Sequence, residues 1–70
     1  MQQITEDQFN TILANAEREN EERASVGLEP MSVTTKSYGA VAGSGELVEY
    51  HFAGSMFGFV QNGVHYSNGL

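Results

Sequence analysis

The fold is decided by residues 46–68, ELVEYHFAGSMFGFVQNGVHYSN, which hold three of the four phenylalanines and two of the three tyrosines. Asn62-Gly63 lies between two alternating apolar runs. This is typical of a two-residue type I′ turn, because both central residues need a positive φ. Gly54-Ser55 is a second candidate two-residue turn, with glycine at the first central position that a type II′ turn requires. The stretch therefore predicts three antiparallel strands in a meander.

The two turns determine which side chains share a face, because side chains alternate across a strand. The first pairs Phe59 with Tyr66, and the second pairs Tyr50 with Phe59. One face is then expected to carry Val48, Tyr50, Phe52, Phe57, Phe59, Val64 and Tyr66. The other, more polar face is expected to carry Leu47, Glu49, His51, Met56, Val60, His65 and Ser67, with Gly58 among them opposite His51 and Ser67. The aromatic face needs a covering element.

One helix is predicted over residues 6–25. Thr5 and Gln8 have the spacing of a capping box. Gly27 suits the left-handed residue that ends a helix, and Pro30 blocks its continuation. An apolar stripe at helical spacing predicts the cover for the aromatic face, and it consists of Phe9, Ile12, Leu13 and Ala16. Beyond this stripe the helix is polar on every side, so about two turns are expected to extend past it.

Residues 31–42, MSVTTKSYGAVA, predict a fourth strand through their β-branched residues and tyrosine, with Gly39 allowing a bend or bulge. A three-residue loop around 43–45 would place Tyr38, Ala40 and Ala42 on the aromatic face, and another loop length would reverse them. The sequence therefore leaves the register of residues 31–42 undetermined. The whole chain, residues 1–70, predicts a single small α+β domain: one N-terminal helix packed on a four-stranded antiparallel β-meander. Its edge strand carries only Lys36 as a charged residue.

The composition narrows the partners and the compartment. A 70-residue chain without cysteine buries only about 60% of its unfolded surface and has no disulfides to stabilise it. Nine acids against three bases give a net charge of −6. This charge opposes direct nucleic-acid binding and permits docking on a basic protein surface. Solubility is the simpler explanation of the acidic composition. Without an apolar run of ~20 residues or a signal-like N-terminus, we expect a cytoplasmic protein with no membrane partner, complete from its initial Met.

Metal and cofactor chemistry is not predicted. His51, His65 and Glu49 are expected to share the polar face, and such residues are common metal ligands. The two histidines would lie on the outer strands of the meander, with backbones about 10 Å apart, which is long for one ion. Two surface histidines without a ligand are the simpler explanation.

Catalysis is not predicted either. Ser67 could lie beside His51 on the polar face, but a flat face offers no cleft, and no nucleophile motif surrounds the serine. The aromatic face is predicted to be core rather than a platform for stacking bases, because the helix stripe needs it and no Lys or Arg flanks it. We therefore expect a non-enzymatic protein.

Two surfaces remain for docking on a partner. One is the acidic end of the helix, with Glu17, Glu19, Glu21 and Glu22, and the other is the polar sheet face, with Leu47, His51, Met56, Val60 and His65. The profile resembles in type, and in no particular motif, the small inhibitors that phages and mobile elements encode against host machinery. The favoured hypothesis is an acidic protein-binding module that occludes a basic, for example nucleic-acid-binding, surface of a host protein. The alternative is a structural or assembly subunit acting as a homodimer or larger homo-oligomer.

Overall fold

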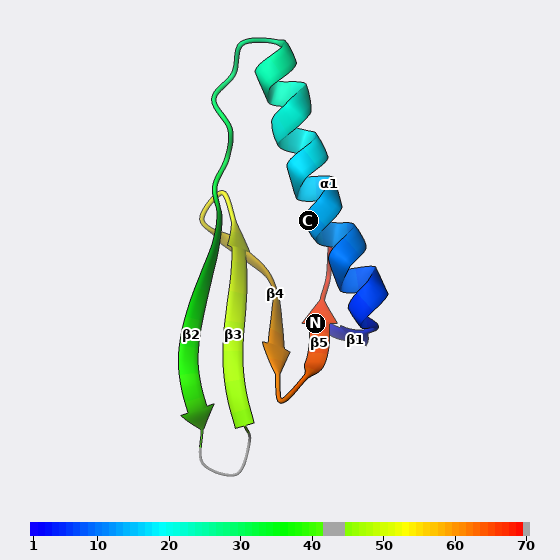
Figure 1. Cartoon of the computed structure of the whole chain (residues 1–70), viewed down its shortest axis with the longest axis vertical. Helices are drawn as coiled ribbons and strands as arrows, with labels where there is room; N and C mark the ends of the chain where they lie inside the picture. Colours follow the sequence, from blue (N-terminus) through cyan, green and yellow to red (C-terminus); the bar gives the residue numbers. More distant parts are fainter. Residues whose placement is uncertain (42–44, 70) are drawn as a thin grey trace.

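The fold is known from a computed structural model that describes residues 1–41 and 45–69. Its elements in chain order are β1 (Gln2–Ile4), α1 (Glu6–Ser25), β2 (Val33–Val41), β3 (Gly45–Phe52), β4 (Ser55–Gln61) and β5 (Val64–Ser67). The strands form one antiparallel sheet in the order β1-β5-β4-β3-β2 (Figure 1). The predicted α+β fold is confirmed, and β1 is a fifth strand in addition to the four that the sequence predicted.

Both ends of α1 follow from local sequence. The Thr5 hydroxyl oxygen accepts a hydrogen bond from the Gln8 amide at 3.0 Å, and the Gln8 side chain accepts one from the Thr5 amide at 2.9 Å. This reciprocal pair is the predicted capping box. At the other end Gly27 has φ +79°, and the Leu28 amide donates to the Arg23 carbonyl at 2.8 Å. The left-handed glycine and this bond between residues five positions apart form a Schellman motif. The predicted helix bounds of 6–25 are therefore confirmed.

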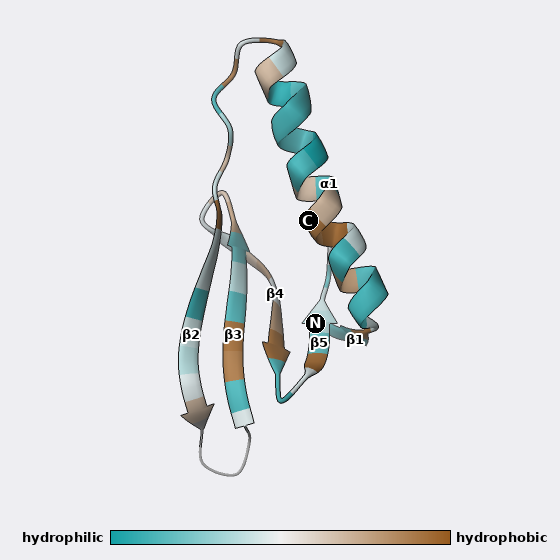
Figure 2. Cartoon of the chain, viewed as in Figure 1, coloured by the Kyte–Doolittle hydropathy of each residue, from teal (hydrophilic) through white to brown (hydrophobic). Residues whose placement is uncertain are grey.

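The helix covers only part of the sheet. Phe9 and Ala16 are buried, whereas Ile12 and Leu13 remain partly exposed. Figure 1 shows the N-terminal half of α1 beside β5 and β1 and its C-terminal half running past the strands. Figure 2 shows that this C-terminal half is mostly hydrophilic. The molecule is consequently elongated, with Cα extents of 47 × 21 × 14 Å.

The turn at Asn62-Gly63 is as predicted. The two residues have φ of +51° and +77°, which are type I′ values that Asn and Gly tolerate. Val60 lies opposite His65 and Phe59 lies opposite Tyr66. The pairing of β4 with β5 therefore follows the sequence prediction.

The other turn was predicted one residue too late. Ala53 and Gly54, with φ of +53° and +83°, form the turn, and Phe52 lies opposite Ser55. The amide of Ala53 donates to the Ser32 carbonyl at 3.1 Å, which ties the turn to the segment before β2. Farther along this ladder Phe57 is an extra residue, because His51 lies opposite Met56 and Tyr50 lies opposite Gly58. This bulge places every later side chain in β4 and β5 on the face opposite to the predicted one.

The bulge defines two sheet faces that differ from the predicted ones. The inner face, toward α1, carries Ile4, Val48, Tyr50, Phe57, Gly58, Val60, His65 and Ser67. The outer face carries Lys36, Tyr38, Leu47, Glu49, His51, Met56, Phe59, Gln61, Val64 and Tyr66. The predictions for Gly58, Val60, His65 and Ser67 as outer residues, and for Phe59, Val64 and Tyr66 as core residues, are therefore wrong.

The register of β2 is also resolved. Lys36 lies opposite Glu49 and Ala40 lies opposite Glu46, with an irregularity between Ser37 and Ala40 where Gly39 has φ +69°. Tyr38 lies on the outer face, not with the core aromatics. Ala42 and residues 43–44 of the predicted loop lie outside the described residues, whereas Gly45, predicted as part of the loop, begins β3 opposite Val41.

Candidate protein-binding surfaces

The inner face is occupied by the core around Phe9. The Phe9 ring lies edge-on to Tyr50 at a centroid distance of 4.9 Å, 6.1 Å from Phe57 and 5.1 Å from the His65 ring. These three partners come from β3, β4 and β5, so one helical side chain joins three strands. In this position the His65 ring fills space in the core instead of contributing to a docking surface.

The predicted docking patch on the sheet is therefore divided between its two faces. Leu47, His51 and Met56 lie on the outer face, as predicted. Val60 lies on the inner face with Val48, in a shallow hollow of about 320 Å³, and His65 lies under Phe9. A partner that contacts Met56 on the outer face cannot contact Val60 or His65 at the same time without wrapping around the sheet.

The outer face carries an apolar patch for which the sequence predicted Leu47 and Met56 but not the residues of β4 and β5 that accompany them. We define the outer patch as Leu47, Met56, Phe59, Val64 and Tyr66. The Phe59 and Tyr66 rings stack across β4 and β5 at 4.7 Å and an interplanar angle of 18°. Met56 is 42% exposed and borders a hollow of about 240 Å³. In the described part of the chain, no helix or strand covers this patch.

Among residues 1–41 and 45–69, the acid that forms hydrogen bonds on the outer face is Glu49. Its Oε1 accepts the Tyr38 hydroxyl at 3.1 Å and lies 3.1 Å from His51 Nε2. Lys36 lies opposite Glu49 in the β2–β3 ladder, with its Nζ 5.2 Å from the Tyr38 ring centroid. One acid and one lysine of opposite sign leave this face close to neutral.

The acidic helix end is exposed, as predicted, but it is attached to the following segment. Glu17, Glu19, Glu21 and Glu22 are all exposed. Between them, the Asn20 side chain donates to the Met31 carbonyl at 2.9 Å and accepts from the Met31 amide at 2.8 Å. Arg23 Nε donates to the Glu29 carbonyl at 2.8 Å. The extension is therefore fixed along one side by the connection to β2.

The histidine and serine positions remove the arrangements considered for metal binding and catalysis. His51 and His65 lie on opposite faces of the sheet, whereas the sequence predicted one shared face. Ser67 is buried on the inner face, away from His51, where its hydroxyl donates to the Phe57 carbonyl and accepts from the Gly69 amide. Within residues 1–41 and 45–69, no three His, Cys, Asp or Glu side chains are grouped closely enough to hold a metal ion.

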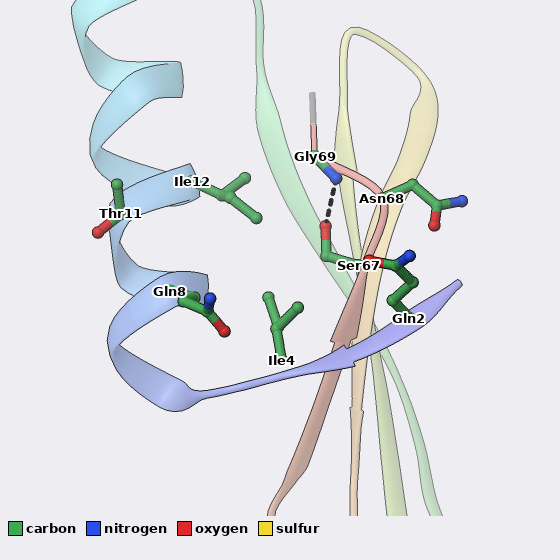
Figure 3. Close-up of a pocket in the computed structure, with 8 residues that line it drawn as sticks. All are labelled: Gln2, Ile4, Gln8, Thr11, Ile12, Ser67, Asn68 and Gly69. Atoms are coloured by element: carbon green, nitrogen blue, oxygen red, sulfur yellow. Dashed lines mark hydrogen bonds between the residues drawn. The ribbon is translucent and has the colours of Figure 1, made fainter.

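A further hollow lies between the start of α1 and the edge of the sheet (Figure 3). It has a volume of about 440 Å³ and is lined by Gln2, Ile4, Gln8, Thr11, Ile12, Ser67, Asn68 and Gly69. These residue types have no ionisable side chain that could act as a general acid or base. Gln8 and Ser67 already hydrogen-bond within the chain.

Comparison with known proteins adds no relatives: no protein-family model matches the chain, and no curated protein or solved structure matches it. Among the helices in the described residues, none is long and apolar enough to cross a membrane. Inference about function therefore depends on the surfaces of the chain itself.

Proposed function

We propose that the chain is a non-enzymatic protein-binding module that docks through the outer patch. The observation that carries this proposal is the stacked Phe59–Tyr66 pair on a sheet face that α1 does not cover. Contiguous apolar patches on small proteins commonly mark interaction sites. Aromatic residues and methionine are also enriched at the centres of protein interfaces.

The acidic helix end supports a more specific role, that of an inhibitor occluding a basic surface of a host protein, as phage and mobile-element inhibitors do. Its four exposed glutamates project from a helix whose far end is attached by Asn20. Such a cluster attracts a basic partner over long range and raises the association rate more than the affinity. In this role the outer patch supplies the contact and the helix supplies the attraction.

A photo-crosslinking residue placed at position 56 or at position 33 tests the docking face. Met56 and Val33 are 42% and 41% exposed, but Met56 is on the outer face and Val33 pairs with Phe52 on the side of Tyr50. We expect protein crosslinks from position 56 in native lysate and few from position 33. Equal capture at both positions, or none at position 56, would exclude the outer patch as the docking face.

Reversing the charge of all four glutamates to lysine separates the two surfaces. If the helix end supplies only attraction, position 56 should still crosslink, and the association rate should fall and lose its salt dependence. Complete loss of the crosslink with an intact circular-dichroism spectrum would indicate that the partner docks on the acidic helix end instead.

A further inference from the structure

We propose that the occupant of the outer patch is a second copy of this chain, packed sheet to sheet about a two-fold axis. This inference rests on the proposed docking through the outer patch, and it assigns that patch to a second copy in place of a host protein. The dimer would have four layers: a helix, two sheets about 10 Å apart at the centre, and a second helix. A two-fold interface uses the same surface on both copies. Three properties of the chain favour such a dimer.

The first property is an underfilled core. The accessible surface of the chain is 4695 Å², compared with about 4300 Å² for a compact monomer of this mass. Its radius of gyration is 13.4 Å, compared with about 11 Å for a compact chain of this length. The apolar side chains buried among the described residues are Phe9, Ala16 and Phe57. Small domains with so little core are commonly stabilised by oligomerisation. A second copy is present wherever the chain is, so it is available to cover the outer patch.

The second property is the distribution of charge. The whole chain has a net charge of −6, but within the described residues the outer face carries one acid, Glu49, opposite one base, Lys36. Contact between two outer faces therefore brings two nearly neutral surfaces together. It also places the two acidic helices on opposite sides of the assembly, separated by more than the Debye length of about 10 Å at 0.1 M salt. A basic foreign protein would instead be attracted to the helices.

The third property is the area of the face. Four strands spaced about 4.8 Å apart, with roughly seven residues each, cover about 19 by 24 Å, or roughly 450 Å² per copy. Two copies present about 900 Å² in projection, and the accessible area of a side-chain surface exceeds its projection. Specific interfaces bury at least about 1000 Å² in total, so the outer face is large enough for a homodimer.

Burial in such a dimer would not leave Glu49 without partners. Its carboxylate already accepts the Tyr38 hydroxyl and lies within hydrogen-bond distance of His51, and Lys36 lies opposite on the next strand. A buried carboxylate is strongly destabilising when a partner is missing. The outer face therefore already supplies partners for Glu49, the acid that the dimer would bury.

Sedimentation equilibrium of the purified full chain, together with two matched variants, tests the inference. We expect a mass twice the 7.6 kDa of the chain at micromolar concentration. Met56→Glu places two like charges in the interface and should weaken dimerisation at least about tenfold. Val33→Glu adds the same charge at the same exposure on the other face and should leave dimerisation unchanged. Circular dichroism of both variants confirms that each is folded.

A monomeric wild-type chain, a dimer that withstands Met56→Glu, or a dimer that Val33→Glu weakens as much as Met56→Glu does, overturns the inference. The crosslinker at position 56 separates this failure from failure of the proposed function. A monomer that crosslinks a different protein from position 56 rejects the second copy but retains the docking face. A monomer that crosslinks nothing rejects both.

Discussion

Replacing Gly58 with alanine tests the placement of β4 and β5 beneath the helix. A Cβ at position 58 would lie 2.7 Å from the carbonyl oxygen of Tyr66, 2.9 Å from Cε1 of Phe9 and 3.2 Å from Cβ of Ser67. The closest of these atoms belongs to the backbone of the paired strand, so no side-chain rotation relieves the contact. The substitution must therefore move β5 or the Phe9 ring.

The sign of the stability change distinguishes the two possible registers. Overpacking a buried site costs about 1–3 kcal/mol, which is a large part of the roughly 3.5–10 kcal/mol expected for 70 residues. Without the bulge at Phe57, position 58 would face outward on the side of His51, where alanine replaces glycine without a clash. It would then stabilise the chain by about 0.4–1 kcal/mol, because it restricts the unfolded state.

Urea unfolding, followed by circular dichroism at a fixed chain concentration, measures this change. With a slope of about 1 kcal/mol per molar urea, the midpoint should fall by about 1–3 M. The variant Phe9→Leu lacks the Cε1 atom, so Gly58→Ala should cost at least about 0.5 kcal/mol less in that background. An unchanged or higher midpoint for Gly58→Ala alone would refute the placement of Gly58 under Phe9.

Two further substitutions test how α1 is held. Asn20→Ala removes both side-chain bonds to Met31 and should cost about 1–3 kcal/mol in urea unfolding; Asn15→Ala, on the exposed face, should change stability by less than about 0.5 kcal/mol. An equal effect of the two would show that the Met31 bonds contribute nothing. Thr5→Ala removes the capping box and should cost about 1 kcal/mol, or about 4–8 °C in melting temperature. Thr11→Ala is its matched control, and a Thr5→Ala melting temperature equal to that control would contradict the capping role.

Features encoded within a few residues were predictable from the sequence. The helix bounds were correct because the Thr5 cap and the Gly27 stop each act within one turn. The Asn62-Gly63 turn was correct because both residues tolerate positive φ. The order of the four meander strands then followed from short connections between consecutive strands.

Features that depend on distant contacts were not predictable. Alanine rarely adopts positive φ, so Ala53 gave no sign of a turn, although its amide bonds to the Ser32 carbonyl. The sequence also gave no sign of the extra residue in β4, the bulge that places Phe57 under Phe9. This one-residue shift exchanged Val60 and His65 for Phe59 and Tyr66 on the outer face, because side-chain alternation reverses with every single-residue slip.

Strand β1 was missed because three residues carry too little periodicity to indicate a strand. Gln2, Gln3 and Ile4 gain strand structure only by pairing with β5 at the other end of the chain. The residues of β4 and β5 in the outer patch were not predicted either, because the bulge decides which of their side chains face outward. Its strongest sequence signal was the high density of aromatics in residues 46–68, which exceeds what one short apolar stripe of α1 can cover.

The attachment of α1 by Asn20 also has a consequence for hydrogen exchange. The N-terminal half of the helix is held by the buried Phe9 ring, whereas the C-terminal half is held by a few hydrogen bonds to residues 29–31. Each such bond contributes about 0.5–1.5 kcal/mol, so amides near Arg23 should exchange through local opening while those near Phe9 require global unfolding. A protein that binds the four glutamates must then order this half of the helix. The conformational entropy lost on ordering reduces the free energy of binding.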